Sequence, residues 1–364
     1  MKTYDTALRM PHVRQLDGLR AIAIVIVFMA HCGLEKVVPG GFGVTIFFFL
    51  SGYLITSLLR VEYSQTGSVD LGAFYLRRAF RILPPLYITM AVVYVANRIA
   101  FPEVQIDNFG VFYQAIFLGN YSYLWHHPKG VDIPLWSLAV EEHFYILFPL
   151  IYSRFLSRRS GPDAARICAY MCAAVLAVRL LYALIFGVSP LMYYWSHTRI
   201  DSILFGCCLA LNNNPALDPD SKRPGKIAVS IAVAALIFCL AYRSGFFRET
   251  FRYTIQGCAL YVIFAFAIHD KGSILNILRS KPLSIIGLYS YTLYLIHVEI
   301  ITIFATYVSS NILILIVLAG LAAMGYCALM YTFIERPFAR LRKALHRENR
   351  GTAGAPAVQG SGAA

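Results

Sequence analysis

The stretch LDGLRAIAIVIVFMAHCG (Leu16–Gly33) decides the fold, because it is long and apolar enough to cross a bilayer as one helix. It nevertheless contains Arg20 and His31, and an ionisable side chain inside lipid costs several kcal/mol unless it faces protein or water. At 100° per residue, the two side chains point to one helix face, roughly 16 Å apart along the axis. The stretch therefore predicts a spanning helix whose polar face turns towards other helices.

The composition places the whole chain in a membrane. Of the 364 residues, 58% are hydrophobic and only 14% are charged, and the mean hydropathy is +0.61. The formal net charge of +13 would indicate nucleic acid as the partner of a soluble protein, but here the basic residues stand in short connections between apolar runs. This placement is typical of topology signals and of contacts with anionic lipid. We therefore expect membrane lipid, and no nucleic acid, as a partner.

The apolar runs predict an all-α polytopic membrane protein with about ten transmembrane helices. The aromatic stretch Phe109–Trp125 is broken by polar residues and glycine, so we expect it to be interfacial or re-entrant. With ten spans, most of the 32 Lys and Arg residues fall on the side of the two termini, and the positive-inside rule then predicts that both termini are cytoplasmic. The predicted spans are residues 17–34, 41–59, 82–100, 136–155, 167–187, 191–211, 227–243, 252–269, 283–306 and 312–334.

One transmembrane domain accounts for residues 16–340. Residues 1–15 are polar and predict a cytoplasmic N-terminal segment, whereas residues 341–364 predict a basic and then disordered cytoplasmic tail. The eight cysteines show no metal-ligand spacing, so we expect buried free thiols and no metal site. Nothing in the sequence indicates an oligomeric state.

The predicted topology orients the first helix, with Arg20 towards the cytoplasm and His31 towards the outside. A neutral imidazole can accept the proton of a hydroxyl, which makes His31 a candidate general base. A packing histidine that is hydrogen-bonded to a neighbouring helix explains the residue equally well.

A cluster of arginines stands in FYLRRAFRILPPLYI (Phe74–Ile88), at the cytoplasmic entry to the third span. Guanidinium groups bind phosphate through paired hydrogen bonds, so Arg78 and Arg81 are candidates for binding a phosphorylated donor together with Arg20. An ordinary positive-inside cluster would have the same sequence.

Two carboxylates lie in PLWSLAVEEHFYILFPL (Pro134–Leu150), about two turns into the fourth span and at a depth comparable with His31. Adjacent residues on a helix point about 100° apart, so at most one of Glu141 and Glu142 can face a given site. Carboxylates are costly in an apolar helix, and we expect one of them to contact a cation or a sugar hydroxyl. In the second span, Ser51 and several glycines predict close helix packing.

Two further stretches are weaker candidates. HTRIDSILFG (His197–Gly206) puts Arg199 and Asp201 at the outer end of the sixth span, where they fit a structural ion pair as well as a substrate contact. SYTLYLIHVEI (Ser290–Ile300) carries His297 about two-thirds of the way outward in the ninth span.

Together these stretches resemble the acyltransferase 3 family, whose members are integral membrane acyltransferases that O-acetylate cell-surface glycans and some small molecules. The sequence departs from the family pattern at Thr45, where an acidic residue is common, and at His143, where glutamine is common. The resemblance runs from about Leu16 to Arg340. It is carried by Arg20 and His31, by Arg78 and Arg81, by Trp136–Glu142, by Arg199 and Asp201, by Tyr294–His297 and by Glu335–Pro337.

The resemblance implies an O-acyltransferase of the bacterial cytoplasmic (inner) membrane. Such an enzyme moves an acetyl or other short acyl group from acyl-CoA, with acetyl-CoA as co-substrate, to a hydroxyl of a glycan or glycolipid at the outer face. A secondary transporter and a glycan-lipid-binding subunit remain the alternatives. In the implied scheme His31 is the base, Arg20, Arg78 and Arg81 hold coenzyme A, Glu141 or Glu142 orients the acceptor or the imidazole, and Trp136, Ser137, Arg199, Asp201 and His297 contact the substrate.

Overall fold

The computed structural model describes residue 10 and residues 12–125, 130–131, 133–270, 272 and 275–342. Within these ranges the chain is all helical, and no β-strand is present. Of the predicted terminal segments, residues 1–15 and 341–364, only residues 10, 12–15 and 341–342 are described.

Seven helices are long and apolar enough to cross a membrane, which confirms an all-α polytopic membrane protein. Three of the ten predicted spans correspond to shorter helices: α5 (Leu135–Ile151), α8 (Asp201–Asn212) and α9 (Lys226–Ala241). The seven long helices are α1 with its π-helical continuation (Arg14–Leu34), α2 (Gly40–Thr66), α3 (Leu71–Ala100), α6 (Gly161–Phe186), α11 (Phe251–His269), α12 (Lys281–Tyr307) and α13 with its continuation (Ile312–Arg342).

The predicted sixth span, residues 191–211, is broken into three pieces. A 3₁₀ turn (Pro190–Tyr193) and the short helix α7 (Ser196–Arg199) precede α8. The break has a local cause, because the Thr198 hydroxyl donates hydrogen bonds to the backbone carbonyls of Met192 and Trp195. Hydropathy does not register such side-chain to backbone bonds. The stretch Phe109–Trp125 also forms only short helices, α4 (Asn108–Ala115) and a 3₁₀ turn (Gly119–Trp125), in agreement with a segment that does not span as one helix.

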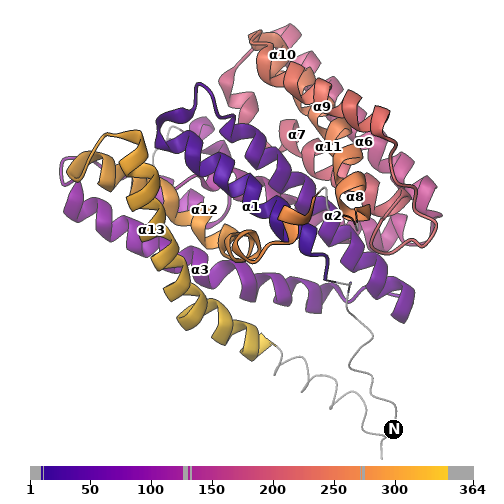
Figure 1. Ribbon diagram of the computed structural model, residues 1–364, viewed down its shortest axis with the longest axis horizontal. Coiled ribbons are helices and arrows are strands. Elements are labelled where there is room, and N and C mark those ends of the chain that lie inside the picture. Colours follow the sequence, from indigo (N-terminus) through magenta and orange to yellow (C-terminus); the bar gives the residue numbers. More distant parts are fainter. Residues whose placement is uncertain are drawn as a thin grey trace, which may run out of the picture.

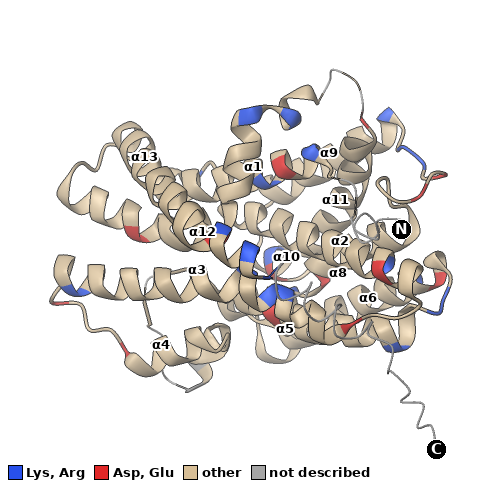
Figure 2. Cartoon of the chain, turned by 90° about the horizontal axis from the view of Figure 1, so that it is seen from below, with Lys and Arg blue, Asp and Glu red and all other residues tan. Residues whose placement is uncertain are grey.

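The outer surface of the bundle is apolar, as a lipid-facing surface requires. Leu184 of α6, Ile227 of α9 and Leu313 of α13 are each more than 70% exposed. In Figure 2 most of the helical surface is uncharged, and basic residues gather between α3, α12 and α5 as well as at helix ends. The interior of the bundle therefore holds a small set of charged side chains, among them Arg179, Arg199 and Asp201.

Helix α1 lies in the middle of the bundle, between α12 and α2 (Figure 1). Helix α2 in turn crosses α8 closely enough for backbones to touch. A Cβ atom at Gly52 would overlap the carbonyl oxygen of Ile203, and one at Gly206 would overlap that of Phe49. The prediction that glycine in the second span permits close helix packing is confirmed for Gly52.

A buried ion pair joins α6 to α8. Arg179 and Asp201 are both fully buried, with Nη2 of Arg179 2.7 Å from Oδ2 of Asp201. The same guanidinium donates to the carbonyl oxygens of Thr198 (2.7 Å) and Thr250 (2.9 Å). Asp201 is thus paired, as one predicted reading held, but with Arg179 and not with Arg199. We expect its role to be structural.

Removal of one partner of this pair should destabilise the protein strongly. Asp201→Ala would leave the buried Arg179 guanidinium uncompensated, which costs about 3–5 kcal/mol of unfolding free energy. Thermal unfolding in detergent should therefore show a much lower midpoint. The control is Asp163→Ala, which removes an exposed pair with Arg166 and should leave the midpoint near that of wild type, because exposed ion pairs contribute little to stability. Equal midpoints for the two variants would contradict the structural role.

The cysteines are free, and seven of the eight are buried, as predicted; Cys258 is exposed. Among the described residues, no group of three or more His, Cys, Asp or Glu side chains is arranged to hold a metal ion.

Candidate active site

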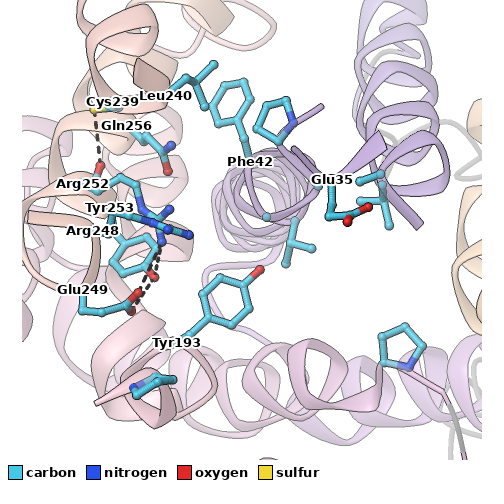
Figure 3. Close-up of a pocket in the computed structure, with 18 of the residues that line it drawn as sticks. Glu35, Phe42, Tyr193, Cys239, Leu240, Arg248, Glu249, Arg252, Tyr253 and Gln256 are labelled. Atoms are coloured by element: carbon cyan, nitrogen blue, oxygen red, sulfur yellow. Dashed lines mark hydrogen bonds and ion pairs between the residues drawn. The ribbon is translucent and has the colours of Figure 1, made fainter. Parts of the chain in front are cut away.

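Two cavities lie along α1, one near each end of the helix. The first, which we call the arginine cavity, has a volume of about 340 Å³ and is lined by Arg20, Arg78 and Arg81. The second, which Figure 3 shows and which we call the histidine cavity, has a volume of about 520 Å³. His31 is among the residues that line it. Val44 and Tyr294 line both cavities. The predicted polar face of the first helix therefore borders two adjoining cavities.

The arginine cavity takes Arg78 and Arg81 from α3, which begins eleven residues before the predicted span at residue 82. The Asp70 side chain caps this helix by accepting a hydrogen bond from the backbone N–H of Ala73 (2.9 Å). Residues three apart share a helix face, so Arg78 and Arg81 both reach the cavity. Arg77 points elsewhere and pairs with Glu62 of α2 at 3.0 Å.

Glu141 belongs to the arginine cavity. Its Oε2 accepts hydrogen bonds from the hydroxyls of Ser51 (2.9 Å) and Tyr145 (2.7 Å). The Arg78 guanidinium lies over the Tyr145 ring, 4.0 Å from its centroid. The prediction placed this carboxylate at the depth of His31, and the structure instead places it on the other side of Val44 and Tyr294.

Glu142 lines neither cavity. It follows Glu141 on α5 and so points about 100° away from it. Its Oε1 atom is buried and has no hydrogen-bond partner among the described residues. Of the two glutamates left open by the sequence, Glu141 is therefore the one that reaches a cavity.

His31 stands in the π-helical turn Ala30–Leu34, which ends α1. Gly33 has a φ angle of 98°, a conformation that turns the chain away from the helix axis and that suits glycine. Nδ1 of His31 lies 2.9 Å from the carbonyl oxygen of Val27. A carbonyl oxygen only accepts, so Nδ1 carries a proton, and in the neutral imidazole Nε2 then keeps its lone pair. This is the protonation that a general base needs.

His297 is a neighbour of His31 and lines neither cavity. It is fully buried, and its ring packs edge-on against His31 with centroids 4.9 Å apart. Its Nδ1 donates to the carbonyl oxygen of Tyr294 (2.8 Å). The substrate contact predicted for His297 stays a prediction, and in the structure its ring contacts that of His31.

Trp136 lines the histidine cavity, and Arg199 stabilises the aromatic wall behind it. Arg199 is fully buried, and its guanidinium carbon lies 3.7 Å from the centroid of the Tyr253 ring and 5.1 Å from that of Tyr193. Such contacts partly compensate a buried cation. Arg199 also donates to the hydroxyl of Thr45 at 3.3 Å, so the residue that replaces the family's acidic side chain faces this guanidinium.

Tyr294 and Val44 separate the two cavities. The Tyr294 hydroxyl is 2.7 Å from the Ser137 hydroxyl and donates to the carbonyl oxygen of Pro134 (3.1 Å). These bonds tie α12 to the start of α5. Sequence reasoning did not assign a site role to Val44, because an apolar residue in a span carries no signal. Tyr294 precedes His297 by three residues, and this spacing on a helix indicates that the two side chains share one face.

Comparisons with known proteins identify the family of the chain. A family model described as an acyltransferase domain matches residues 13–332. O-acetyltransferase OatA of Staphylococcus aureus is 33% identical over 88% of this chain and 56% of its own length. Peptidoglycan O-acetyltransferase OatA of Listeria monocytogenes is 31% identical over 80% of this chain and 50% of its own length. No solved structure matches.

The chain spans about half the length of the curated relatives it matches. A putative O-acetyltransferase of S. aureus strain COL gives the same picture, with 30% identity over 93% of this chain and 59% of the relative. The family model covers most of the chain, and residues 13–332, which it matches, include every residue that lines the two cavities. The chain therefore belongs to the acyltransferase 3 family.

Proposed function

We propose that this chain is a membrane O-acyltransferase that moves an acetyl or other short acyl group from acyl-CoA to a glycan hydroxyl. One observation carries the proposal. Two cavities adjoin at Val44 and Tyr294, and one contains three arginines whereas the other contains a histidine with a free Nε2. A phosphorylated donor suits the first cavity and a hydroxyl acceptor suits the second.

The donor, acetyl-CoA, would bind with its phosphates at Arg20, Arg78 and Arg81. Arginine binds phosphate through charge-assisted, paired hydrogen bonds. The pantetheine arm is long and flexible, so it would extend along α1 and bring the thioester to the junction of the cavities. Glu141, held by Ser51 and Tyr145, would keep the arginines apart and oriented.

In the transfer step, Nε2 of His31 takes the proton of the acceptor hydroxyl as its oxygen attacks the thioester carbonyl. The new ester C–O bond forms, the C–S bond breaks, and the leaving thiolate of coenzyme A receives the proton from His31. The edge-on contact with His297 and the bond to Val27 would hold the imidazole ring in place.

The membrane arrangement is part of the same proposal. Ten spans with both termini in the cytoplasm would put the arginine cavity on the cytoplasmic side, where acyl-CoA is made, and the histidine cavity on the outer side of the bacterial inner membrane. The acceptor would be a cell-surface or exported glycan or glycolipid. A related Listeria protein is named a peptidoglycan O-acetyltransferase, so peptidoglycan fragments are a suitable first acceptor.

The purified full chain in detergent, supplied with radiolabelled acetyl-CoA and peptidoglycan fragments, should produce a base-labile labelled glycan and release coenzyme A in equal amount. Transport of a glycan across proteoliposomes without consumption of acetyl-CoA would favour a secondary transporter. Glycan binding with no transfer would favour a binding subunit.

A larger side chain at the junction should block transfer without blocking donor binding. Val44→Phe fills the boundary between the cavities, and we expect the rate of acyl transfer to fall about tenfold or more while the affinity for acetyl-CoA stays within about twofold. Overpacking of this kind costs about 1–3 kcal/mol. The control Ile46→Phe carries a similar cost in the same helix but lines neither cavity, so equal losses of transfer in both variants would contradict a passage at Val44.

A further inference from the structure

The wall of the histidine cavity carries more positive than negative charge. Its lining includes four cations, Lys36, Arg243, Arg248 and Arg252, and two carboxylates, Glu35 and Glu249. Figure 3 shows Arg248, Arg252 and Glu249 together on one wall, with Glu35 on the opposite wall. Binding of a neutral sugar would not require this excess of positive charge.

Few of these cations are neutralised by the protein itself. Arg252 lies 3.9 Å from Glu249, and Arg243 donates to the carbonyl oxygen of Lys36 at 3.3 Å. Among the described residues, no carboxylate lies within ion-pair distance of Lys36, Arg243 or Arg248. Arg248 is exposed to the cavity, so its guanidinium is available to a ligand.

Topology does not explain the cations. Under the proposed orientation this cavity opens on the outer side, where the positive-inside rule disfavours Lys and Arg. Under that orientation the outward-facing basic residues are Lys36, Arg98, Lys129, Arg199, Arg243, Arg248 and Arg252, and four of these seven line this cavity. Like charges in a partly enclosed cavity repel each other, and a bound anion removes that repulsion.

We propose that the histidine cavity selects an acceptor glycan that carries a negative charge, either a carboxylate or a phosphate, near the hydroxyl to be acylated. Arg248, which has no carboxylate within ion-pair distance among the described residues, binds the anionic group, because a guanidinium matches both anions through paired hydrogen bonds. Trp136 and Tyr193, which line the same cavity, contact the face of the sugar ring and direct its hydroxyl towards His31. This inference rests on the proposed acyl transfer and adds the acceptor class to it.

The test compares matched acceptors with the full chain in detergent. One pair is an oligosaccharide ending in glucuronic acid and the same oligosaccharide ending in glucose; a second pair is a sugar linked to a lipid pyrophosphate and the same sugar on a neutral lipid. We expect wild type to prefer an anionic member by about tenfold or more in kcat/KM. Preference in the first pair identifies a carboxylate, and preference in the second identifies a phosphate.

Arg248→Gln should reduce this preference to about threefold or less, and Arg248→Glu should abolish it. Arg98→Gln is the control, because Arg98 is an exposed arginine of α3 that lines neither cavity, and it should keep the wild-type preference. Equal kcat/KM for charged and neutral acceptors in wild type would overturn the inference and leave the acyltransferase proposal standing. Absence of transfer to all four acceptors and to peptidoglycan fragments would overturn the acyltransferase proposal itself.

Discussion

His31→Ala is expected to lower the rate of acyl transfer by about 10²–10⁴-fold, the contribution of a positioned general base. The loss should appear in kcat, because the proposed donor site is the arginine cavity, which His31 does not line. The measurement is the initial rate of label transfer from acetyl-CoA to the acceptor with purified protein.

Two observations separate a lost base from a damaged fold. His31→Gln keeps a side chain that can donate to the carbonyl oxygen of Val27, but it has no basic nitrogen, so its rate should be as low as that of His31→Ala. Both variants should keep the wild-type affinity for acetyl-CoA and elute as folded protein. A glutamine variant with more than about a tenth of the wild-type rate would contradict the role of His31 as base.

Arg78→Gln combined with Arg81→Gln is expected to raise the KM for acetyl-CoA by about 100-fold or more. Each charge-assisted hydrogen bond to a phosphate contributes about 1.5–3 kcal/mol, and two arginines are removed. The matched control is Arg77→Gln, whose side chain pairs with Glu62 and lines neither cavity. Its KM should stay within about twofold of wild type.

A truncated donor tests whether Arg78 and Arg81 act on the phosphates of the donor. S-acetyl-pantetheine carries the thioester but no phosphate, so wild type and the double variant should use it equally poorly. A large difference between them with this donor would mean that the arginines act on the fold or on the acyl group and not on the phosphates.

The parts of the fold that follow from hydrophobicity were predictable from sequence. The long apolar runs form helices. Arg20 and His31 line cavities, because an ionisable side chain that faces lipid has a high free-energy cost. The predicted sixth span was wrong as one helix, since backbone-binding polar side chains around Thr198 break it without lowering its hydropathy.

The pairing of charges was less predictable, because it depends on how helices far apart in sequence are placed. Arg179 and Asp201 are 22 residues apart and come from different helices, whereas the sequence left an ion pair with the nearer Arg199 and a substrate contact equally open. The prediction that Glu141 lies at the depth of His31 was wrong for a related reason. On helix α5, Trp136 lines the histidine cavity, and Glu141, little more than one turn later, lines the arginine cavity. Val44 shows the limit most clearly, because only its position between two cavities distinguishes it from other apolar residues.

The central claim is that the acyl group passes through the protein from the arginine cavity to the histidine cavity. It is tested most directly with proteoliposomes in which the acceptor is sealed inside and labelled acetyl-CoA is added only outside. We expect labelled acceptor inside the vesicles that contain wild type, no label with His31→Ala, and strongly reduced label with Val44→Phe. Labelling that requires donor and acceptor on the same side of the membrane would contradict the account.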